Sequence, residues 1–181
     1  MRRPRKKLKV DEEAAPSKPL TPEEARQRTF QRAVKLLAAR SRSEAELREL
    51  LLQRRASSKA DVEEAIERLR EYGYLDDERF AFGYASLKLR QRPLGRQRLK
   101  RDLKMKKVDQ ATIDEALDLA YAEVSEEELI DQAIEKRIRT RGRPKTRVQA
   151  QSLFQHLMRQ GFPLDLVSEK VRALSTPDSY D

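Results

Sequence analysis

Signals that begin and end helices recur at short intervals along this chain, and they restrict its fold more than any other feature. A Ser or Thr followed three residues later by Glu is the pattern of a capping box, which begins a helix. Such pairs occur at Thr21 and Glu24, Ser43 and Glu46, and Ser125 and Glu128, with Ser58 and Asp61 as a weaker version and Asp76 or Asp77 and Asp109 as further caps. Gly73 and the segments 93–95, 142–144 and 161–163 indicate helix ends.

Between these signals, apolar residues recur at helical spacing, and little of the chain suits strands. Only five glycines are present, and no stretch alternates polar and apolar residues for long. We therefore predict an all-α protein in which three tandem three-helix repeats form an elongated, curved array. The expected helices lie near residues 22–40, 43–55, 58–72, 76–91, 95–107, 109–123, 125–140, 144–160 and 163–174.

Self-alignment supports the grouping of these helices by threes. The same spacing of apolar residues, 10 and then 4 positions, recurs in Leu52, Val62 and Ile66, in Leu103, Ile113 and Leu117, and in Leu157, Val167 and Val171. Chance matches among amphipathic helices are the alternative explanation, but the middle and last helices of all three groups align together. The expected units are residues 21–75, 76–124 and 125–174, between a disordered basic tail at 1–20 and a flexible tail at 175–181.

A unit of about 50 residues can barely bury a core alone. The units should therefore support one another in a row, whose extended surface suits the binding of a long or large partner.

The composition favours a binding protein over an enzyme. Forty Lys and Arg against 31 Asp and Glu give a net charge of +9, the sign expected for binding nucleic acid or another polyanion. The chain has no Cys, no Gly-rich phosphate loop and no apolar run near the roughly 20 residues of a membrane span. His156 is the only histidine and is expected on a helix surface, while the acidic clusters should complement helix dipoles rather than hold a metal. We predict no enzymatic activity, cofactor, metal site or membrane association.

The positive charge is concentrated in two runs. Residues 88–107 contain ten basic residues and one acidic residue, and residues 136–147 contain seven basic residues and no acidic residue. On a helix over 95–107, four basic residues would form a stripe without an acidic residue within it, which favours a binding stripe over an idle solvated face. The stripe consists of Arg96, Lys100, Lys104 and Lys107. The candidate partner or nucleic-acid contacts are Lys88, Arg90, Arg92, Arg96, Arg98, Lys100, Arg101, Lys104, Lys107, Arg139, Arg141, Arg143, Lys145 and Arg147.

Four segments resemble the RecX family, the regulators of the RecA recombinase. They are Ala33–Arg40 followed by Ser43-Glu44-Ala45-Glu46-Leu47, then Tyr72-Gly73-Tyr74-Leu75-Asp76-Asp77-Glu78-Arg79-Phe80-Ala81, Gly95-Arg96-Gln97-Arg98-Leu99-Lys100-Arg101-Asp102-Leu103, and Phe154-Gln155-His156-Leu157-Met158-Arg159-Gln160-Gly161-Phe162. The match covers about residues 25–174 in the expected order, and its second string is the most specific.

The resemblance implies three tandem three-helix repeats, a cytoplasmic location and no enzymatic activity. It also implies that the protein modulates RecA, usually by inhibiting its recombinase, ATPase and co-protease functions in DNA repair and the SOS response. Members of the family are thought to bind in the groove of the RecA–DNA filament or to cap its growing end, and some bind DNA. The expected partners are thus RecA and the RecA–ssDNA filament, with weak direct DNA binding by a monomer.

Two other functions remain open from the residues alone. A direct DNA-binding module would use the helices near 43–55 and 58–72 as a helix-turn-helix, but the second of these is strongly acidic. A helical-repeat scaffold for an unrelated acidic protein is the other alternative.

Overall fold

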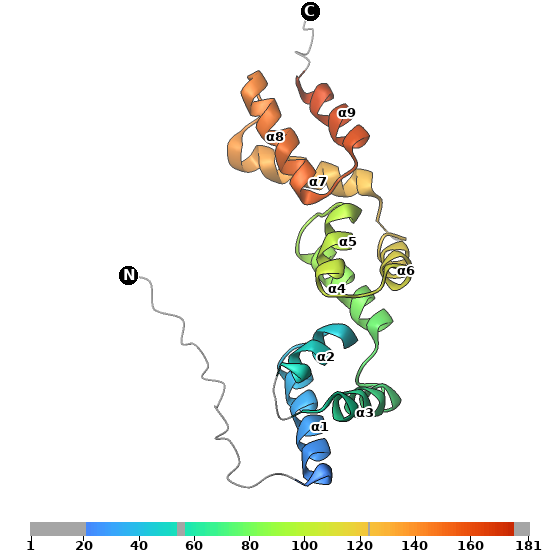
Figure 1. Cartoon of the computed structure of the whole chain (residues 1–181). Coiled ribbons are helices and arrows are strands. Elements are labelled where there is room, and N and C mark those ends of the chain that lie inside the picture. Colours follow the sequence, from blue (N-terminus) through green and yellow to red (C-terminus); the bar gives the residue numbers. More distant parts are fainter. Residues whose placement is uncertain (1–20, 54–56, 123, 176–181) are drawn as a thin grey trace, which may run out of the picture.

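The computed structural model describes residues 21–53, 57–122 and 124–175, and these form nine helices and no strand (Figure 1). The helices are α1 (Pro22–Ala39), α2 (Glu44–Leu52), α3 (Lys59–Glu71), α4 (Asp77–Gln91), α5 (Arg96–Met105), α6 (Gln110–Ala120), α7 (Glu126–Arg141), α8 (Arg147–Gln160) and α9 (Leu164–Ser175). The all-α prediction is confirmed.

The helices stack as three groups of three in an elongated, curved row, with α1–α3 at one end, α4–α6 in the middle and α7–α9 at the other end (Figure 1). Each group has its own core. The first is built around Leu47, Ile66 and Leu69, the second around Leu99 and Leu103, and the third around residues of α7, α8 and α9. Three thin cores of this kind suit a chain with a large charged fraction and no Trp. The exact unit boundaries at 75/76 and 124/125 remain predictions.

The cap signals act as the sequence indicates. Thr21, Ser58 and Ser125 form complete capping boxes with the residues three positions on, and Ser43 accepts a hydrogen bond from the backbone N–H of Glu46. Asp76, rather than Asp77, caps α4, and Asp109 caps α6. Satisfying the free N–H groups of the first turn in this way stabilises each helix by about 1 kcal/mol.

Four helix bounds differ from the prediction by two residues or more. α2 ends at Leu52 rather than at residue 55. α8 begins at Arg147 rather than at Pro144, because Thr146 accepts from the N–H of Gln149 and so caps the helix there. α5 ends at Met105, and Lys107 lies beyond it with a φ of 61°. α6 ends at Ala120 rather than at residue 123.

The repeat alignment is displaced by one residue in the first unit. Leu52 is 42% exposed, whereas Leu51 is fully buried and takes the place that Leu103 and Leu157 hold in the other two units. The other aligned positions are buried as predicted. The tails expected at 1–20 and after 175 lie outside the described residues.

Candidate binding surface

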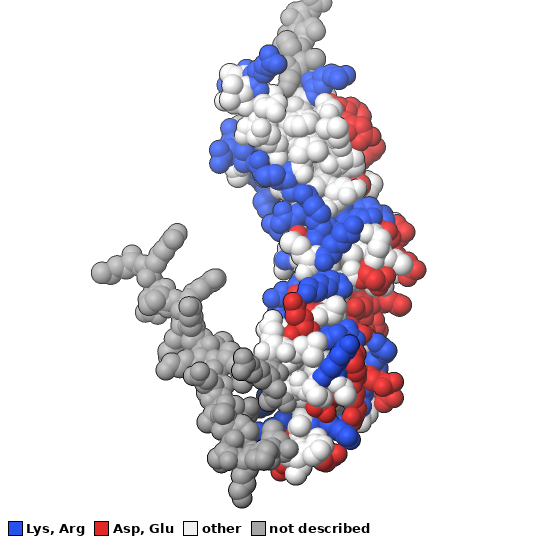
Figure 2. Space-filling model, in the orientation of Figure 1, with Lys and Arg blue, Asp and Glu red and all other residues white. Residues whose placement is uncertain are grey.

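Basic side chains gather on one face of the array. Figure 2 shows Lys and Arg as a diagonal band that runs from the α7–α8 end into the middle group, whereas Asp and Glu collect along one edge. The run at 88–107 lies on α4, α5 and their connections, and the run at 136–147 lies on α7 and the segment before α8. The middle and last groups adjoin where α5 packs against α8.

The stripe predicted on α5 is largely paired with acidic side chains of other helices. Arg96 pairs with Asp118 of α6, and the Nζ of Lys100 lies 2.8 Å from Oδ1 of Asp114, also on α6. No acidic residue lies within the stripe itself, as predicted, but carboxylates from a separate helix offset its charge.

Lys107 is not part of the stripe either. Its left-handed backbone conformation follows the end of α5, and its Nζ lies 2.6 Å from Oε2 of Glu49 on α2. Lys104 is the exposed member of the predicted stripe for which the described residues include no acidic partner.

Some of the remaining basic residues of the first run contact neighbouring side chains, and the others are exposed. The Nε of Arg98 lies 3.1 Å from Oδ1 of the buried Asp102, and the Nζ of Lys88 lies 5.4 Å from the centroid of the Tyr84 ring. Arg101 donates to the backbone oxygen of Gln97 and is exposed. Arg90 and Arg92, at the end of α4, are exposed as well. The exposed basic residues of this run without an acidic partner among the described residues are thus Arg90, Arg92, Arg101 and Lys104.

The last residues of α7 and the whole of α8 contain basic residues and no acidic one. Residues 136–164 contain eight basic residues and no acidic residue, and α8 has no carboxylate at all. Five candidate residues of this run are exposed, namely Arg139, Arg141, Arg143, Lys145 and Arg147. Across the part of the chain that the structure describes, no ion pair joins Arg139, Arg141, Lys145 or Arg147 to an acid. This region is the strongest candidate for contact with a polyanion.

Two arginines that the sequence analysis did not select lie within the same region. Arg137 on α7 donates to the Oγ of Ser152 on α8 at 3.4 Å, and Arg159 lies farther along α8. Burial lowers the pKa of the Arg137 guanidinium, and the charges of Arg141 and Arg159 lower it further. Arg137 and Arg141 are spaced by one helical turn, but only the packing of α7 on α8 adds Arg159 to them.

His156 lies beside these arginines and is half-buried. Burial lowers the pKa of its imidazole, and Arg137, Arg159 and Arg141 lower it further, in that order. Its Nε2 is 3.0 Å from Nε2 of Gln160, a contact in which the amide donates and the neutral imidazole accepts. The prediction that His156 is a simple helix-surface residue therefore leaves out its cationic surroundings.

The first and middle groups meet at a polar joint formed by the start of α2. The backbone N–H of Glu44 donates to Oδ1 of Asp77 at 2.8 Å, and the hydroxyl of Ser43 donates to the backbone oxygen of Lys106. The Nζ of Lys106, which is largely buried, lies 3.4 Å from Oε1 of Glu46. Burial raises the pKa of the Asp77 carboxyl, although the hydrogen bond from Glu44 opposes this.

The middle and last groups meet at a joint of two glycines. The N–H of Gly95 donates to the oxygen of Gln160 at 3.0 Å, and the N–H of Gln97 donates to the oxygen of Gly161 at 3.2 Å. A Cβ on Gly95 would lie 2.3 Å from backbone atoms of Gly161 and Phe162, so only glycine allows the two main chains to approach this closely. The Tyr121 hydroxyl donates to the Leu94 backbone oxygen at 2.9 Å. The Tyr121 side chain packs against the cores of both the middle and the last group.

The four segments that resemble the RecX family therefore meet in pairs at the two joints. The segment starting at Ser43 contacts the Tyr72–Ala81 string through Glu44 and Asp77, and the Gly95 string contacts the segment ending in Gly161-Phe162. These segments fix how the groups sit relative to one another, and the second joint brings α5 against α8, which has no acidic residue.

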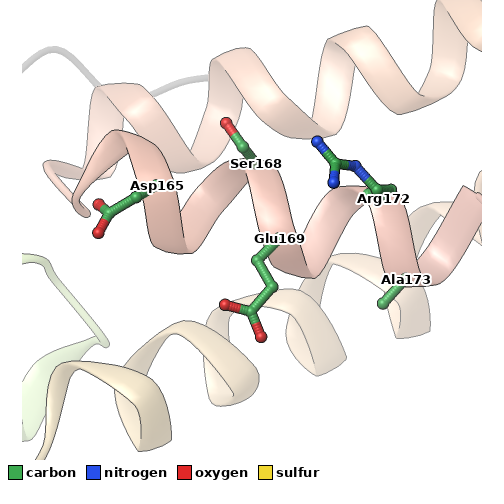
Figure 3. Close-up of a pocket in the computed structure, with 5 residues that line it drawn as sticks. All are labelled: Asp165, Ser168, Glu169, Arg172 and Ala173. Atoms are coloured by element: carbon green, nitrogen blue, oxygen red, sulfur yellow. The ribbon is translucent and has the colours of Figure 1, made fainter.

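A surface hollow at α9 is lined by five side chains of that single helix, and Figure 3 shows them pointing in different directions rather than toward one point. In the described ranges, no group of three or more His, Cys, Asp or Glu side chains is placed to hold a metal ion. The same residues include no helix that is both long and apolar enough to cross a membrane.

Comparison with known proteins identifies relatives of the chain. Residues 76–117 match the family described as RecX, second three-helix domain. The chain is 34% identical over 142 residues to the regulatory protein RecX of Bacillus velezensis, covering 78% of this chain and 53% of that protein, and 32% identical over 152 residues to that of Bacillus subtilis, covering 84% and 57%. Against the regulatory protein RecX of Treponema pallidum it is 38% identical over 110 residues, covering 61% of this chain and 66% of that protein.

The solved structures agree on the fold. The crystal structure of RecX from Lactobacillus salivarius superposes with a TM-score of 0.71 at 20% identity, covering 84% of this chain and 97% of that chain. The chain spans about half the length of the Bacillus relatives that it matches. Sequence, fold and the domain match agree that this chain belongs to the RecX family of regulatory proteins.

Proposed function

We propose that this protein binds RecA and RecA–DNA filaments and modulates, mostly by inhibition, the recombinase, ATPase and co-protease activities of RecA in DNA repair and the SOS response. It acts in the cytoplasm as a monomer, as a binding protein without catalytic activity or a cofactor. The observation that carries the proposal is the basic band that extends over two groups of helices in a chain of the RecX family.

The physical basis is the match between an extended basic surface and a filament in which protein and DNA phosphate repeat along one axis. A row of units held at fixed joints presents its charges over a length greater than one globular domain would. Contact with adjacent filament subunits would hinder the rearrangement that accompanies ATP hydrolysis and the addition of monomers. Because counterions leave when phosphates are bound, the interaction should weaken as salt increases.

The test compares sedimentation of the protein with RecA–ssDNA filaments, with RecA alone and with DNA alone, while ATP hydrolysis by RecA is measured in parallel. Preference for the filament together with slower hydrolysis supports the proposal. Failure to sediment with the filament would instead favour a scaffold for an unrelated acidic protein.

The ion pairs of α5 determine which variant suits this test. Neutralising Arg96, Lys100 and Lys104 together would also break the ion pairs with Asp118 and Asp114. The double variant Arg101→Gln and Lys104→Gln removes exposed charge from the same helix without doing so. Its matched control is Lys35→Gln with Lys59→Gln, which removes two exposed charges from the first group. The first variant should weaken filament binding and reduce its salt dependence, and the control should not.

A direct DNA-binding function without dependence on RecA is the second candidate. The acid-free stretch at 136–164 favours it, because this surface suits phosphate whether or not RecA is present. Equal binding to bare DNA and to the filament, with unchanged ATP hydrolysis, would support this function over the first.

A further inference from the structure

The facing surfaces of α7 and α8 hold three arginines around the chain's only histidine. Arg137 and Arg141 are one turn apart on α7, and His156 and Arg159 are about one turn apart on α8. The hydrogen bond from Arg137 to Ser152, one turn before His156, shows that these two faces oppose each other. No carboxylate from residues 136–164 neutralises the cluster, and none of its three arginines makes an ion pair with another described residue.

We propose that Arg137, Arg141 and Arg159 bind a phosphate group of a DNA strand, and that His156 takes up a proton when the phosphate is bound. The inference rests on the proposed function, since the DNA of the filament supplies the strand. It adds the site, the chemical group that is recognised and a linked proton.

The arrangement of the donors favours phosphate over the carboxylate of an acidic protein. A guanidinium presents its N–H donors in a planar fork, and one such fork satisfies the two oxygens of a carboxylate. Three guanidinium groups from two helices offer more N–H donors than one carboxylate accepts, and the non-bridging oxygens of phosphates along a DNA strand supply further acceptors. Like charges held this closely repel one another when no anion is bound, so an anion stabilises the cluster.

Gln160 provides the partner that His156 needs in either protonation state. In the structure the Gln160 amide donates to Nε2 of the imidazole, while its own Oε1 is buried without a hydrogen-bond partner in the described residues. A protonated imidazole carries a hydrogen on Nε2 and cannot accept there. Rotation of the Gln160 amide would then turn Oε1 toward that hydrogen and satisfy the buried oxygen.

The charges that act on the ring determine the direction of the linkage. They are Arg137 and Arg141 from α7 and Arg159 from its own helix, and α5 and α9, which also pack against α8, add none to this set. All three are positive, and together with burial they keep the imidazole pKa below 6.5 in the free protein. A phosphate among them offsets their field, so the pKa rises on binding and DNA binds more tightly as the pH falls.

The experiment uses the full chain without a histidine tag, because a single histidine then gives one imidazole signal in NMR. The pH titration of this signal is recorded with and without a saturating single-stranded DNA oligonucleotide. We expect the midpoint to lie below 6.5 in the free protein and to rise on binding. A rise of about one pH unit corresponds to roughly tenfold tighter binding below both midpoints than above them.

Matched variants separate a specific phosphate site from general attraction. Arg137→Gln should weaken DNA binding and remove most of the pH dependence. Arg139→Gln removes the same charge from the same helix at an exposed position outside the cluster, and it should leave the pH dependence intact. His156→Gln should bind DNA with an affinity that no longer changes between pH 8 and pH 6, in about the range where an imidazole titrates.

An imidazole midpoint that does not move with DNA would overturn the inference, as would an equal loss of pH dependence in Arg137→Gln and Arg139→Gln. A midpoint that rises as much with poly-glutamate as with DNA would overturn the assignment to phosphate. If the wild-type protein still slows RecA ATP hydrolysis in any of these cases, only this inference fails. If it does not affect RecA while the midpoint still moves with DNA, the proposed function fails and the phosphate site stands.

Discussion

Gly95→Ala should destabilise the protein through a contact between two groups of helices rather than through backbone strain. Gly95 has a φ of −79° and a ψ of 155°, which any residue adopts, so alanine adds no conformational strain there. The added Cβ would lie 2.3 Å from the backbone of Gly161, and neither main chain can yield without breaking the joint.

The size of the effect follows from the hydrogen bonds at the joint. Separating the chains removes the bonds from Gly95 to Gln160 and from Gln97 to Gly161, each contributing about 0.5–1.5 kcal/mol. Alanine is also a poorer N-cap than glycine by about 0.5–1 kcal/mol. We therefore expect the free energy of unfolding to fall by about 2–4 kcal/mol.

Urea denaturation followed by circular dichroism measures this change. Gly83→Ala is the control, because Gly83 lies within α4 and a Cβ there would meet nothing within 4 Å. That variant should be stabilised by about 0.5–1 kcal/mol, since alanine favours a helix interior more than glycine does. A loss of less than about 1 kcal/mol in Gly95→Ala, or a change of the same sign in both variants, would refute the steric argument.

Three further predictions address the joints. Ser43→Ala removes both an N-cap and the hydrogen bond to Lys106, so it should lower the free energy of unfolding by about 2–3 kcal/mol, against about 1 kcal/mol for Ser58→Ala, which removes a cap alone; equal losses in thermal melts would contradict the role of Ser43 between groups. Asp77→Asn keeps an oxygen acceptor for the Glu44 N–H and removes a carboxylate whose pKa burial raises. Because the folded pKa exceeds the unfolded value, the wild type gains stability from Asp77 below about pH 4 and loses it as the pH rises through the folded pKa. The variant should thus equal or exceed the wild type at pH 7 and lose this advantage near pH 3, and a constant difference at both pH values would argue against it. Tyr121→Phe deletes the hydrogen bond to Leu94 while keeping the ring between two cores, so it should cost about 1–2 kcal/mol; a neutral result in urea denaturation would mean that the bond contributes nothing.

The helix content and most helix starts and ends were predictable because their causes are local. A capping box such as Ser125 with Glu128 requires only residues three positions apart, and glycine after a helix, as at Gly161, marks an end whatever surrounds it. Two of the errors in the helix bounds have a local cause. Thr146 overrides Pro144 as the start of α8, and the turn after Met105 removes Lys107 from the stripe.

The candidate surface was predictable only in part. The charge runs are visible in the chain, but the acids that neutralise Arg96 and Lys100 come from α6 and leave no pattern on α5. The cluster around His156 depends in the same way on the packing of α7 against α8.

The sequence by itself determined that this chain is helical, divided into repeats of three helices, basic and related to the RecX family, because hydrophobic period, caps, composition and motifs are properties of residues close together along the chain. Only the tertiary structure decided that the family's motifs meet at two joints and that Arg96 and Lys100 of α5 are paired with acidic residues of α6. The physical reason is that charge pairing and close packing depend on distance in space. Asp114 and Asp118 of α6 neutralise basic side chains of α5, although the two helices are separate segments of the chain.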